Sequence, residues 1–289
     1  MNGIMIQGTS SGAGKTFIVT GLCRLFSDKG IRICPFKSQN MSSNSALTHD
    51  GLEIAIAQSL QAQAARLIPE AFMNPILLKP QNDHSSQIIL NGKIYADSNP
   101  NYRQFTQTAG INAVREALAH IAENFEAVII EGAGSPAEVN LNHSEIVNMR
   151  IAREANVPVI LVADVDRGGS LAAVAGTLAL LGDDKKRVKG IIYNMFRGDI
   201  GLFTDAVRWT ENYTGVKVVG VVPFMKGVNL PEEDSLIRRG AEKNSGHEIF
   251  TPAAIDDSFD EIARVLSDSL DIDYVLRLIH REGTMPQQI

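Results

Sequence analysis

The sequence has little cysteine, few aromatic residues and no long apolar run. Of its 289 residues only two are cysteine, Cys23 and Cys34, and neither belongs to a CxxC pair or lies near a set of histidines. A disulfide framework and a cysteine-bound zinc site are therefore excluded, and both thiols are expected in the core. No apolar segment is long enough to span a bilayer, and no charged leader precedes the first glycine-rich loop. We expect a cytoplasmic protein that does not enter a membrane.

Basic residues are also fewer than acidic residues. The formal net charge is -6 and the isoelectric point is about 5.6. Such a chain has no overall basic field to hold a nucleic-acid backbone, so we expect no nucleic-acid partner. An anionic ligand must instead be bound by local devices, such as helix N-termini and single lysine or arginine side chains.

Short apolar runs alternate with segments that have the helical spacing of apolar residues. The runs predict strands at Ile4–Gln7, Ile31–Phe36, Ala127–Glu131, Val157–Asp164, Val188–Asn194 and Val216–Pro223. The spacing predicts helices at Phe17–Asp28, Glu53–Leu67, Tyr102–Asn124, Leu171–Leu181 and Leu202–Tyr213. Because most of the strand segments are apolar throughout, they should be buried on both faces. The pattern predicts an α/β fold, with a mostly parallel sheet and helices on both faces.

One domain is expected to hold residues 1–236, with residues 237–289 forming a linker and a helical tail that packs on the same domain. Met73–Asn91 breaks the alternation and predicts an insertion over the face that carries the chemistry. The stretch after Leu236 is polar and contains glycine, as linkers do, whereas Ile255–Arg281 is amphipathic and predicts one or two helices.

The strongest local motif is the run GTSSGAGKT, Gly8 to Thr16, which lies between an expected strand and an expected helix. Its glycines allow backbone N–H groups to surround phosphate oxygens, Lys15 adds a charge near the transferred phosphate, and the Thr16 hydroxyl can bind Mg²⁺. Thr9 takes the place of the usual first glycine, which lies one residue earlier. The motif predicts a P-loop NTPase fold with ATP and Mg²⁺ as cofactors.

Other charged residues follow the expected strands, where ligands bind in such sheets. Glu131 ends one strand and can reach a metal opposite Thr16, and the small residues after it let the backbone approach a ligand. Further acidic candidates, for each of which a solvated surface charge is the alternative, are Asp50, Glu53, Glu145, Asp164 and Asp166. The matching cations are Lys37, Lys79, Arg167 and Arg197.

Nine ordered blocks carry a family resemblance. They are QGTSSGAGKT, PFKSQNMSSNS, DGLEIAIAQSLQAQAA, MNPILLKP, EGAGSPAEVNL, IVNM, ADVDRGG, FRGD and PEEDSL. Over about residues 4 to 236 the chain resembles the N-terminal synthetase part of the cobyric acid synthase family, in the dethiobiotin-synthetase-like branch of P-loop proteins. The resemblance implies ATP-dependent amidation of the b, d, e and g carboxylates of a corrinoid, adenosylcobyrinic acid a,c-diamide, through an acyl phosphate.

The resemblance also implies residue roles. The nucleotide would be bound by Thr9, Gly12, Ala13, Gly14, Lys15 and Thr16, with Asn194 at the base. The metal would be bound by Thr16, Glu53 and Glu131. The catalytic residues would be Lys15, Lys37 and Glu145, and the substrate contacts Gln39, Asn40, Ser42 and Ser135.

Three departures from the family pattern stand out. Glu145 replaces the usual aspartate before IVNM, and Met195 replaces a lysine after Asn194, which bears on base selectivity. Family members commonly continue into a glutaminase domain, yet no cysteine follows Leu236 that could be its nucleophile. We expect no glutaminase domain here, with ammonia supplied free or by a separate glutaminase subunit, and we expect a homodimer.

Three alternatives stay open. The chain could be a related carboxylate-activating enzyme, such as cobyrinic acid a,c-diamide synthase or dethiobiotin synthetase, although SQNMSSNS and ADVDRGG favour cobyric acid synthase. It could be a non-catalytic partitioning-type ATPase, but those proteins usually carry an extra lysine where this loop has Thr9-Ser10-Ser11. It could also be an ATP-binding scaffold for a glutaminase partner.

Overall fold

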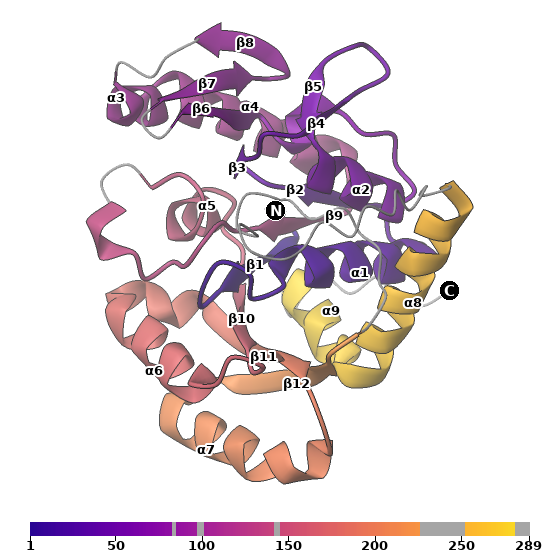
Figure 1. Ribbon diagram of the computed structural model, residues 1–289, viewed down its shortest axis with the longest axis vertical. Helices are drawn as coiled ribbons and strands as arrows, with labels where there is room; N and C mark the ends of the chain where they lie inside the picture. Colours follow the sequence, from indigo (N-terminus) through magenta and orange to yellow (C-terminus); the bar gives the residue numbers. More distant parts are fainter. Residues whose placement is uncertain (83–84, 97–100, 142–144, 226–251, 281–289) are drawn as a thin grey trace.

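A six-stranded parallel sheet forms the centre of the molecule (Figure 1). The computed structural model describes residues 1–82, 85–96, 101–141, 145–225 and 252–280. In spatial order the strands are β12 (Lys217–Pro223), β11 (Val188–Phe196), β10 (Val159–Asp164), β1 (Gly3–Gly8), β9 (Ala127–Glu131) and β2 (Ile33–Phe36). All six correspond to strands predicted from the apolar runs, and the α/β fold class is confirmed.

Helices cover both faces of this sheet and create two hydrophobic cores. One face packs against α1 (Lys15–Asp28), α2 (Ile56–Ala64), α8 (Pro252–Ser269) and α9 (Ile272–His280). The other packs against α4 (Ala109–Asn124), α5 (Met149–Glu154), α6 (Ser170–Leu180) and α7 (Thr204–Thr214). Successive residues of β1 alternate between the cores, with Ile4 and Ile6 in the first and Met5 in the second.

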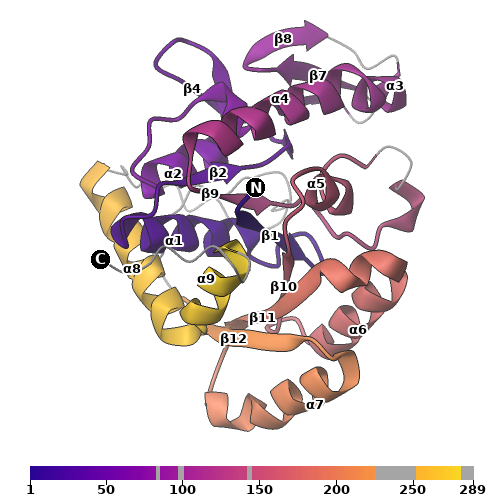
Figure 2. The same ribbon diagram turned by 180° about the vertical axis from the view of Figure 1, so that it is seen from behind.

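A smaller sheet lies beyond the β2 edge. It contains β3 (Gln39–Met41), β6 (Ile76–Asn82), β7 (Ser85–Leu90) and β8 (Lys93–Ala96) in that order, while β4 (Ser45–Leu47) and β5 (Glu53–Ala55) form a separate antiparallel pair. Helix α4 contacts both β6 and β9 and so joins the two sheets (Figure 2). The break in rhythm at Met73–Asn91 therefore corresponds to sheet structure that extends from β6 to β7.

Two helix predictions are wrong in detail. Glu53 was placed in a helix, but Glu53–Ala55 pairs with Ser45–Leu47 as β5, so α2 begins only at Ile56. The single helix predicted over Tyr102–Asn124 is divided into α3 (Tyr102–Gln107) and α4, because Thr108 adopts φ -125° and ψ -101°, which is not helical. Helix α5 was not predicted at all. Four short 3₁₀ helices complete the structure described: Ala71–Met73, Val139–Leu141, Gly182–Arg187 and Ile200–Phe203.

The two helices of the tail segment, α8 and α9, contact the main domain. Helix α8 packs against α1, and α9 contacts β1 (Figure 1). The Arg24 guanidinium, which is 1% exposed, binds Asp260 through Nε at 2.6 Å and Asp256 through Nη2 at 2.9 Å. The linker at 237–251 and the PEEDSL block at 231–236 lie outside the described residues.

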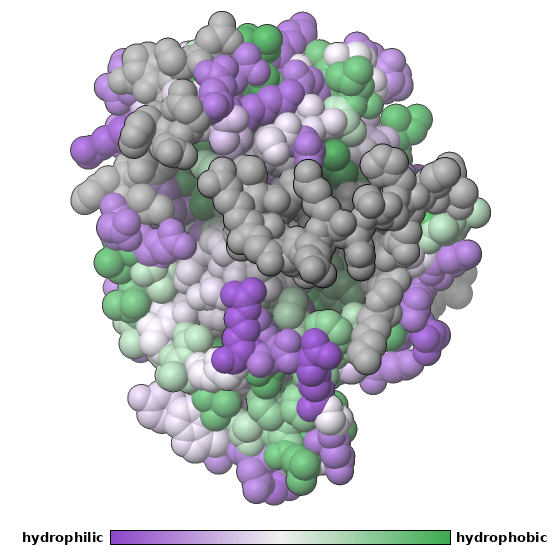
Figure 3. All heavy atoms as spheres, in the orientation of Figure 1, coloured by the Kyte–Doolittle hydropathy of each residue, from purple (hydrophilic) through white to green (hydrophobic). Residues whose placement is uncertain are grey.

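The two cysteines lie in the core, as the sequence predicts. Cys23 and Cys34 are both free and buried, and burial raises the pKa of each thiol. Within the described residues, no helix combines the length and apolarity that crossing a membrane requires. Some large apolar side chains do reach the surface near α7, among them Leu202 and Tyr213, and Figure 3 shows apolar side chains at that end of the molecule.

Candidate nucleotide and acid site

The phosphate loop joins β1 to α1 at the carboxyl edge of the sheet. Gly12 and Gly14 adopt φ 74° and φ 88°, values that favour glycine, and α1 begins at Lys15 directly after them. The Lys15 ammonium folds back over the loop and donates hydrogen bonds to the carbonyls of Ser10 at 3.2 Å and Gly134 at 3.1 Å. The loop therefore presents a helix N-terminus and a lysine side by side, which is the arrangement that binds polyphosphate.

Strand order brings the other charged groups to this loop. Ile6 of β1 pairs with Glu131 of β9, and Phe36 at the end of β2 pairs with Ile130. The residue after each strand end therefore lies at the same edge. Lys37 follows β2 directly, so its side chain reaches the Glu131 carboxylate on the neighbouring strand.

Glu131 is the centre of a buried polar cluster. Its Oε1 accepts hydrogen bonds from the Thr16 hydroxyl at 3.0 Å and from Lys37 Nζ at 2.9 Å, and its Oε2 accepts one from Gln61 Nε2 at 2.5 Å. Glu131 is 1% exposed and Lys37 is 4% exposed. Burial acts to raise the pKa of Glu131, but the Lys37 charge and the donors of Lys37 and Gln61 hold this pKa below the ordinary value for glutamate. The pair is therefore an ionised carboxylate beside an ammonium group.

The donor set fits a magnesium ion that is bound together with a nucleotide. Mg²⁺ takes oxygen ligands, and in nucleotide sites one or two protein oxygens are combined with phosphate oxygens and water. The Thr16 hydroxyl and the Glu131 carboxylate are two such oxygens on adjacent elements. No group of three or more His, Cys, Asp or Glu that could hold a metal occurs in the described residues, and phosphate oxygens and water would supply the remaining ligands.

The proposed substrate contacts lie on and after β3, next to this cluster. Gln39 Oε1 accepts a hydrogen bond from the Tyr102 hydroxyl at 2.5 Å. Asn40 is buried, and its Nδ2 donates to Gln58 Oε1 at 3.0 Å. The Ser42 hydroxyl donates to the carbonyl of Asn44 at 2.9 Å and thereby shapes the loop. Asn40 is linked to the cluster through Gln58 and Gln61, which reaches Glu131.

Several predicted residues lie outside the cluster around Glu131. Glu53 on β5 pairs with Lys79 and accepts a hydrogen bond from the Ser45 hydroxyl at 2.8 Å, and the described contacts do not link it to Thr16. Lys79 and Ser45 hold the pKa of Glu53 below its usual value despite partial burial, which opposes ionisation. Its role as a metal ligand stays a prediction.

Glu145 has a structural role in addition to the predicted catalytic one. Its Oε1 accepts from the backbone N–H groups of Val147 at 2.5 Å and Asn148, and its Oε2 accepts from the N–H of Arg150 at 2.8 Å. These groups precede and begin α5, so Glu145 satisfies donors that the helix itself leaves free. Its catalytic role stays a prediction.

The remaining nucleotide-side residues surround the loop. Thr9 N–H donates to the carbonyl of Val162 at 2.9 Å, and Asn194 Nδ2 donates to the carbonyl of Ala13 at 3.0 Å. The Ser135 N–H donates to Glu138 Oε1 at 3.2 Å in the loop that also provides the Lys15 acceptor. Asn194 therefore contacts the phosphate loop directly, and its contact with a base stays a prediction.

Sequence reasoning missed Gln58 and Gln61, the two α2 residues that extend the cluster. Both are 0% exposed. Their spacing of three residues places them on one face of α2, a signal present in AQSLQAQAA that could have found them. Glutamine on a helix is usually solvent-exposed, so only the position of α2 against Glu131 distinguishes them.

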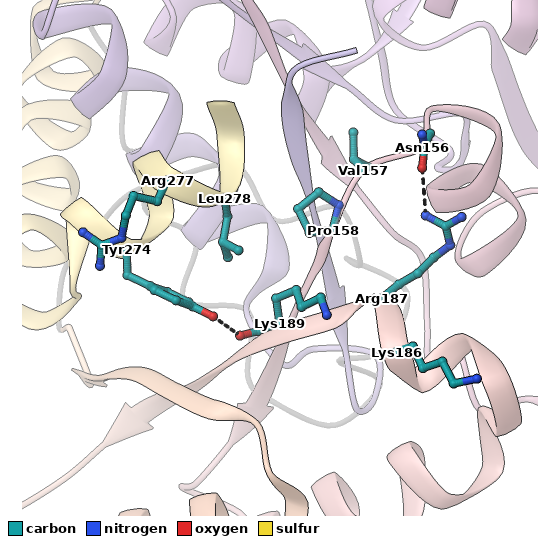
Figure 4. A pocket seen from close by; sticks show the side chains of 9 residues that line it. All are labelled: Asn156, Val157, Pro158, Lys186, Arg187, Lys189, Tyr274, Arg277 and Leu278. Atoms are coloured by element: carbon teal, nitrogen blue, oxygen red, sulfur yellow. Dashed lines mark hydrogen bonds between the residues drawn. The ribbon is translucent and has the colours of Figure 1, made fainter. Parts of the chain in front are cut away.

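A separate cavity lies at the opposite edge of the sheet. Figure 4 shows this cavity of about 450 Å³ between α9 and the start of β10 and β11. Cationic side chains line it, and the Tyr274 hydroxyl donates to the carbonyl of Lys189 across it at 2.7 Å. The phosphate loop follows the carboxyl end of β1, so this cavity is not part of the nucleotide site.

The parallel sheet, the glycine-rich loop between β1 and α1, and the Lys-Thr pair at the start of α1 together define a P-loop nucleotide-binding protein. Residues 4–237 match the family described as the CobQ/CobB/MinD/ParA nucleotide binding domain, and the chain belongs to that family.

Curated relatives carry a more specific name. The chain is 50% identical over 235 residues to the cobyric acid synthase of Aliivibrio fischeri, covering 81% of this chain and 47% of that protein. It is 49% identical over 255 residues to the cobyric acid synthase of Geobacillus kaustophilus, covering 87% of this chain and 51% of that protein. The chain thus spans about half the length of the curated relatives it matches.

Among solved structures, the signal recognition particle receptor FtsY of Elizabethkingia anophelis aligns with 89% of this chain and 65% of that chain. Its TM-score is 0.45 and its identity 15%, a similarity too low to bear on function.

Proposed function

We propose that this chain is an ATP-dependent amide ligase of the cobyric acid synthase type, which amidates the side-chain carboxylates of adenosylcobyrinic acid a,c-diamide. The observation that carries the proposal is the cluster in which Lys15, Thr16, Lys37 and Glu131 meet, beside the polar segment Gln39–Ser42 on and after β3. Relatives with that name, about 50% identical over roughly half of their own length, support the substrate class.

Ammonia cannot displace oxide directly from a carboxylate, so the carboxylate must first be given a better leaving group. A substrate carboxylate oxygen attacks the γ-phosphorus of ATP, the bond to the β,γ-bridging oxygen breaks, and ADP leaves, giving an acyl phosphate. Ammonia then attacks the acyl carbon, phosphate leaves, and the nitrogen loses a proton to form the amide. Mg²⁺, when bound, would neutralise phosphate charge and orient the phosphates.

The cluster gives each residue a physical task in these steps. Lys15 is placed to pair with phosphate oxygens, since it already lies across the loop. Lys37 can neutralise charge shared by the phosphoryl group and the incoming carboxylate, while Glu131 fixes its position through the 2.9 Å contact. Gln39, Asn40 and Ser42 would then bind the acid.

A turnover assay tests this proposal. Purified protein would be incubated with ATP, Mg²⁺, an ammonium salt and one acid at a time, and ADP release and the mass of the corrinoid would be measured. We expect ADP release only with the a,c-diamide, together with stepwise amidation, and no turnover in Lys15→Ala. Turnover with cobyrinic acid or a dethiobiotin precursor instead would reassign the substrate, and hydrolysis indifferent to every acid would reject the ligase.

Three accompanying proposals concern the setting of the reaction. Ammonia is supplied free or by a separate glutaminase chain, the active form is a homodimer, and the enzyme works in the cytoplasm. Glutamine would then replace ammonium only after a glutaminase is added. Light scattering of the purified chain measures the subunit number.

A further inference from the structure

A series of side-chain amides connects β3 to Glu131 at the end of β9, which contacts Thr16 beside the phosphate loop. Asn40 Nδ2 donates to Gln58 Oε1 at 3.0 Å, Gln58 Nε2 donates to Gln61 Oε1 at 3.4 Å, and Gln61 Nε2 donates to Glu131 Oε2 at 2.5 Å. All four side chains are at least 97% buried. These bonds are therefore shielded from competing water.

The groups at the two ends of this series of amides determine which atom donates and which accepts in every hydrogen bond of the series. At one end the backbone N–H of Met41 donates to Asn40 Oδ1 at 2.9 Å, which leaves Nδ2 to face Gln58. At the other end the Glu131 carboxylate can only accept. Gln58 and Gln61 must therefore each point the amide oxygen toward Asn40 and the amide nitrogen toward Glu131. If either amide alone turned over, two acceptor oxygens would face each other.

We propose that Gln58 and Gln61 are positioning residues that transmit the orientation of Asn40 to the Glu131 carboxylate. The inference rests on the proposed function only for the identity of the ligands at the two ends. An acid that draws on the Asn40 amide would change the donors available to Glu131, which also holds Thr16 and Lys37. Affinity for the acid and affinity for Mg·ATP are then coupled, and the coupling is reciprocal.

We call the series of hydrogen bonds from Asn40 through Gln58 and Gln61 to Glu131 the amide relay. Asn40→Asp tests this relay at the end that lies farthest from Glu131. The new carboxylate still accepts from Met41 N–H, but it cannot donate to Gln58. Gln58 and then Gln61 must turn over, and the Gln61 oxygen would face the Glu131 carboxylate. Gln58→Met and Gln61→Met break the relay nearer to Glu131 with little change in side-chain length.

Gln63→Met is the matched control. Gln63 lies on the same helix, but it is exposed and its amide donates only to the Ser59 hydroxyl at 3.4 Å in the described contacts. The measurement is the dissociation constant of ATP by calorimetry, with Mg²⁺ and with EDTA, together with the melting temperature of the ligand-free protein. No acid is present in these titrations.

We expect Asn40→Asp, Gln58→Met and Gln61→Met each to weaken Mg·ATP binding about tenfold, the order expected for a lost hydrogen bond to a charged group. ATP affinity in EDTA should stay within about twofold of wild type, and Gln63→Met should match wild type throughout. Asn40→Asp combined with Gln61→Met should be no weaker than Gln61→Met alone, because both act through one chain of bonds.

Two results would overturn the relay. In one, Asn40→Asp binds Mg·ATP like wild type while Gln61→Met does not, so Gln61 acts only locally. In the other, the variants lose affinity equally with Mg²⁺ and with EDTA in step with a lower melting temperature, as a structural role requires. If the variants show the predicted Mg·ATP pattern but the wild-type protein amidates no corrinoid, the proposed substrate is rejected and the proposal of the relay still stands.

Discussion

The side-chain amide of Asn194 donates a hydrogen bond to the carbonyl of Ala13 over 3.0 Å and so ties the end of β11 to the phosphate loop. The approach is close because the next residue, Gly14, has no side chain. A Cβ at this position would lie 2.1 Å from Asn194 Nδ2.

Gly14→Ala should therefore weaken ATP binding by at least about tenfold, because the residue has φ 88° and left-handed backbone costs a residue with a Cβ roughly 1–2 kcal/mol before the clash is counted. Calorimetric titration with ATP measures the effect. Gly176→Ala is the control, since no atom lies within 4 Å of its added Cβ. It should leave ATP affinity unchanged and raise stability by about 0.5–1 kcal/mol, as expected in a helix. Equal ATP affinity in both variants would contradict the close contact.

Glu145 can be tested for its two roles separately. Glu145→Ala removes the acceptor for the α5 N–H groups and should lower the free energy of unfolding by about 1–2 kcal/mol. Glu145→Gln keeps an acceptor but loses the charge, so it should retain more of the stability. Urea unfolding and the amidation assay would be run on both variants. If Glu145→Gln turns over at the wild-type rate, the carboxylate has no catalytic task and serves the helix alone.

Arg24 fastens the tail helix α8 to α1. Arg24→Met should lower the free energy of unfolding by about 2 kcal/mol, since hydrogen bonds to charged groups are lost. The comparison is Arg115→Met, whose side chain is 55% exposed and pairs with Glu154 at the surface. That substitution should cost less than about 1 kcal/mol. Urea titrations of both variants measure the difference, and similar losses would show that burial of Arg24 adds nothing.

Low pH should reduce the contribution of Asp271 to the free energy of unfolding. The hydrogen bond from Lys217 and then the Tyr274 N–H lower the pKa of Asp271 below its usual 3.8. A carboxyl group of this kind stabilises the fold above its unfolded pKa, and the contribution is lost as the pH falls through the folded pKa. The stability advantage of wild type over Asp271→Asn should therefore be constant near neutral pH and shrink below about pH 3.8. Urea unfolding at a series of pH values measures it, and an advantage that persists undiminished in acid would contradict the assignment.

The sequence allowed the central sheet to be predicted because its strands are buried on both faces. Such strands are apolar throughout, and their pattern does not depend on which neighbour they pair with. The smaller sheet was different. Segment Gln39–Met41 pairs with Ile76–Leu78, a partner more than thirty residues away, and nothing local in three polar-rich residues indicates a strand. Glu53 was misplaced for a more local reason, because its antiparallel pairing with nearby Leu47 overrides helical spacing.

The site was predictable where a strand end or a loop motif fixes position. Lys15, Thr16 and Lys37 follow strands that the sequence reveals and Glu131 ends one, and the structure brings them together. Gln61 was not predictable in that way, because its burial depends on how α2 lies against β9. Glu145 differs, because its capping contacts are local, to the N–H groups of Val147, Asn148 and Arg150, and they were missed because α5 itself was not predicted.

Strand β1 lies in the middle of the sheet between β9 and β10, yet those partners begin at residues 127 and 159, and α8 reaches α1 only from residue 252. During translation, the first strand and helix leave the ribosome long before the segments that cover them have been made. An apolar strand without neighbours is prone to associate with other nascent chains. The order of the strands therefore delays the burial of β1 and α1 until segments far along the chain have been made, which slows folding.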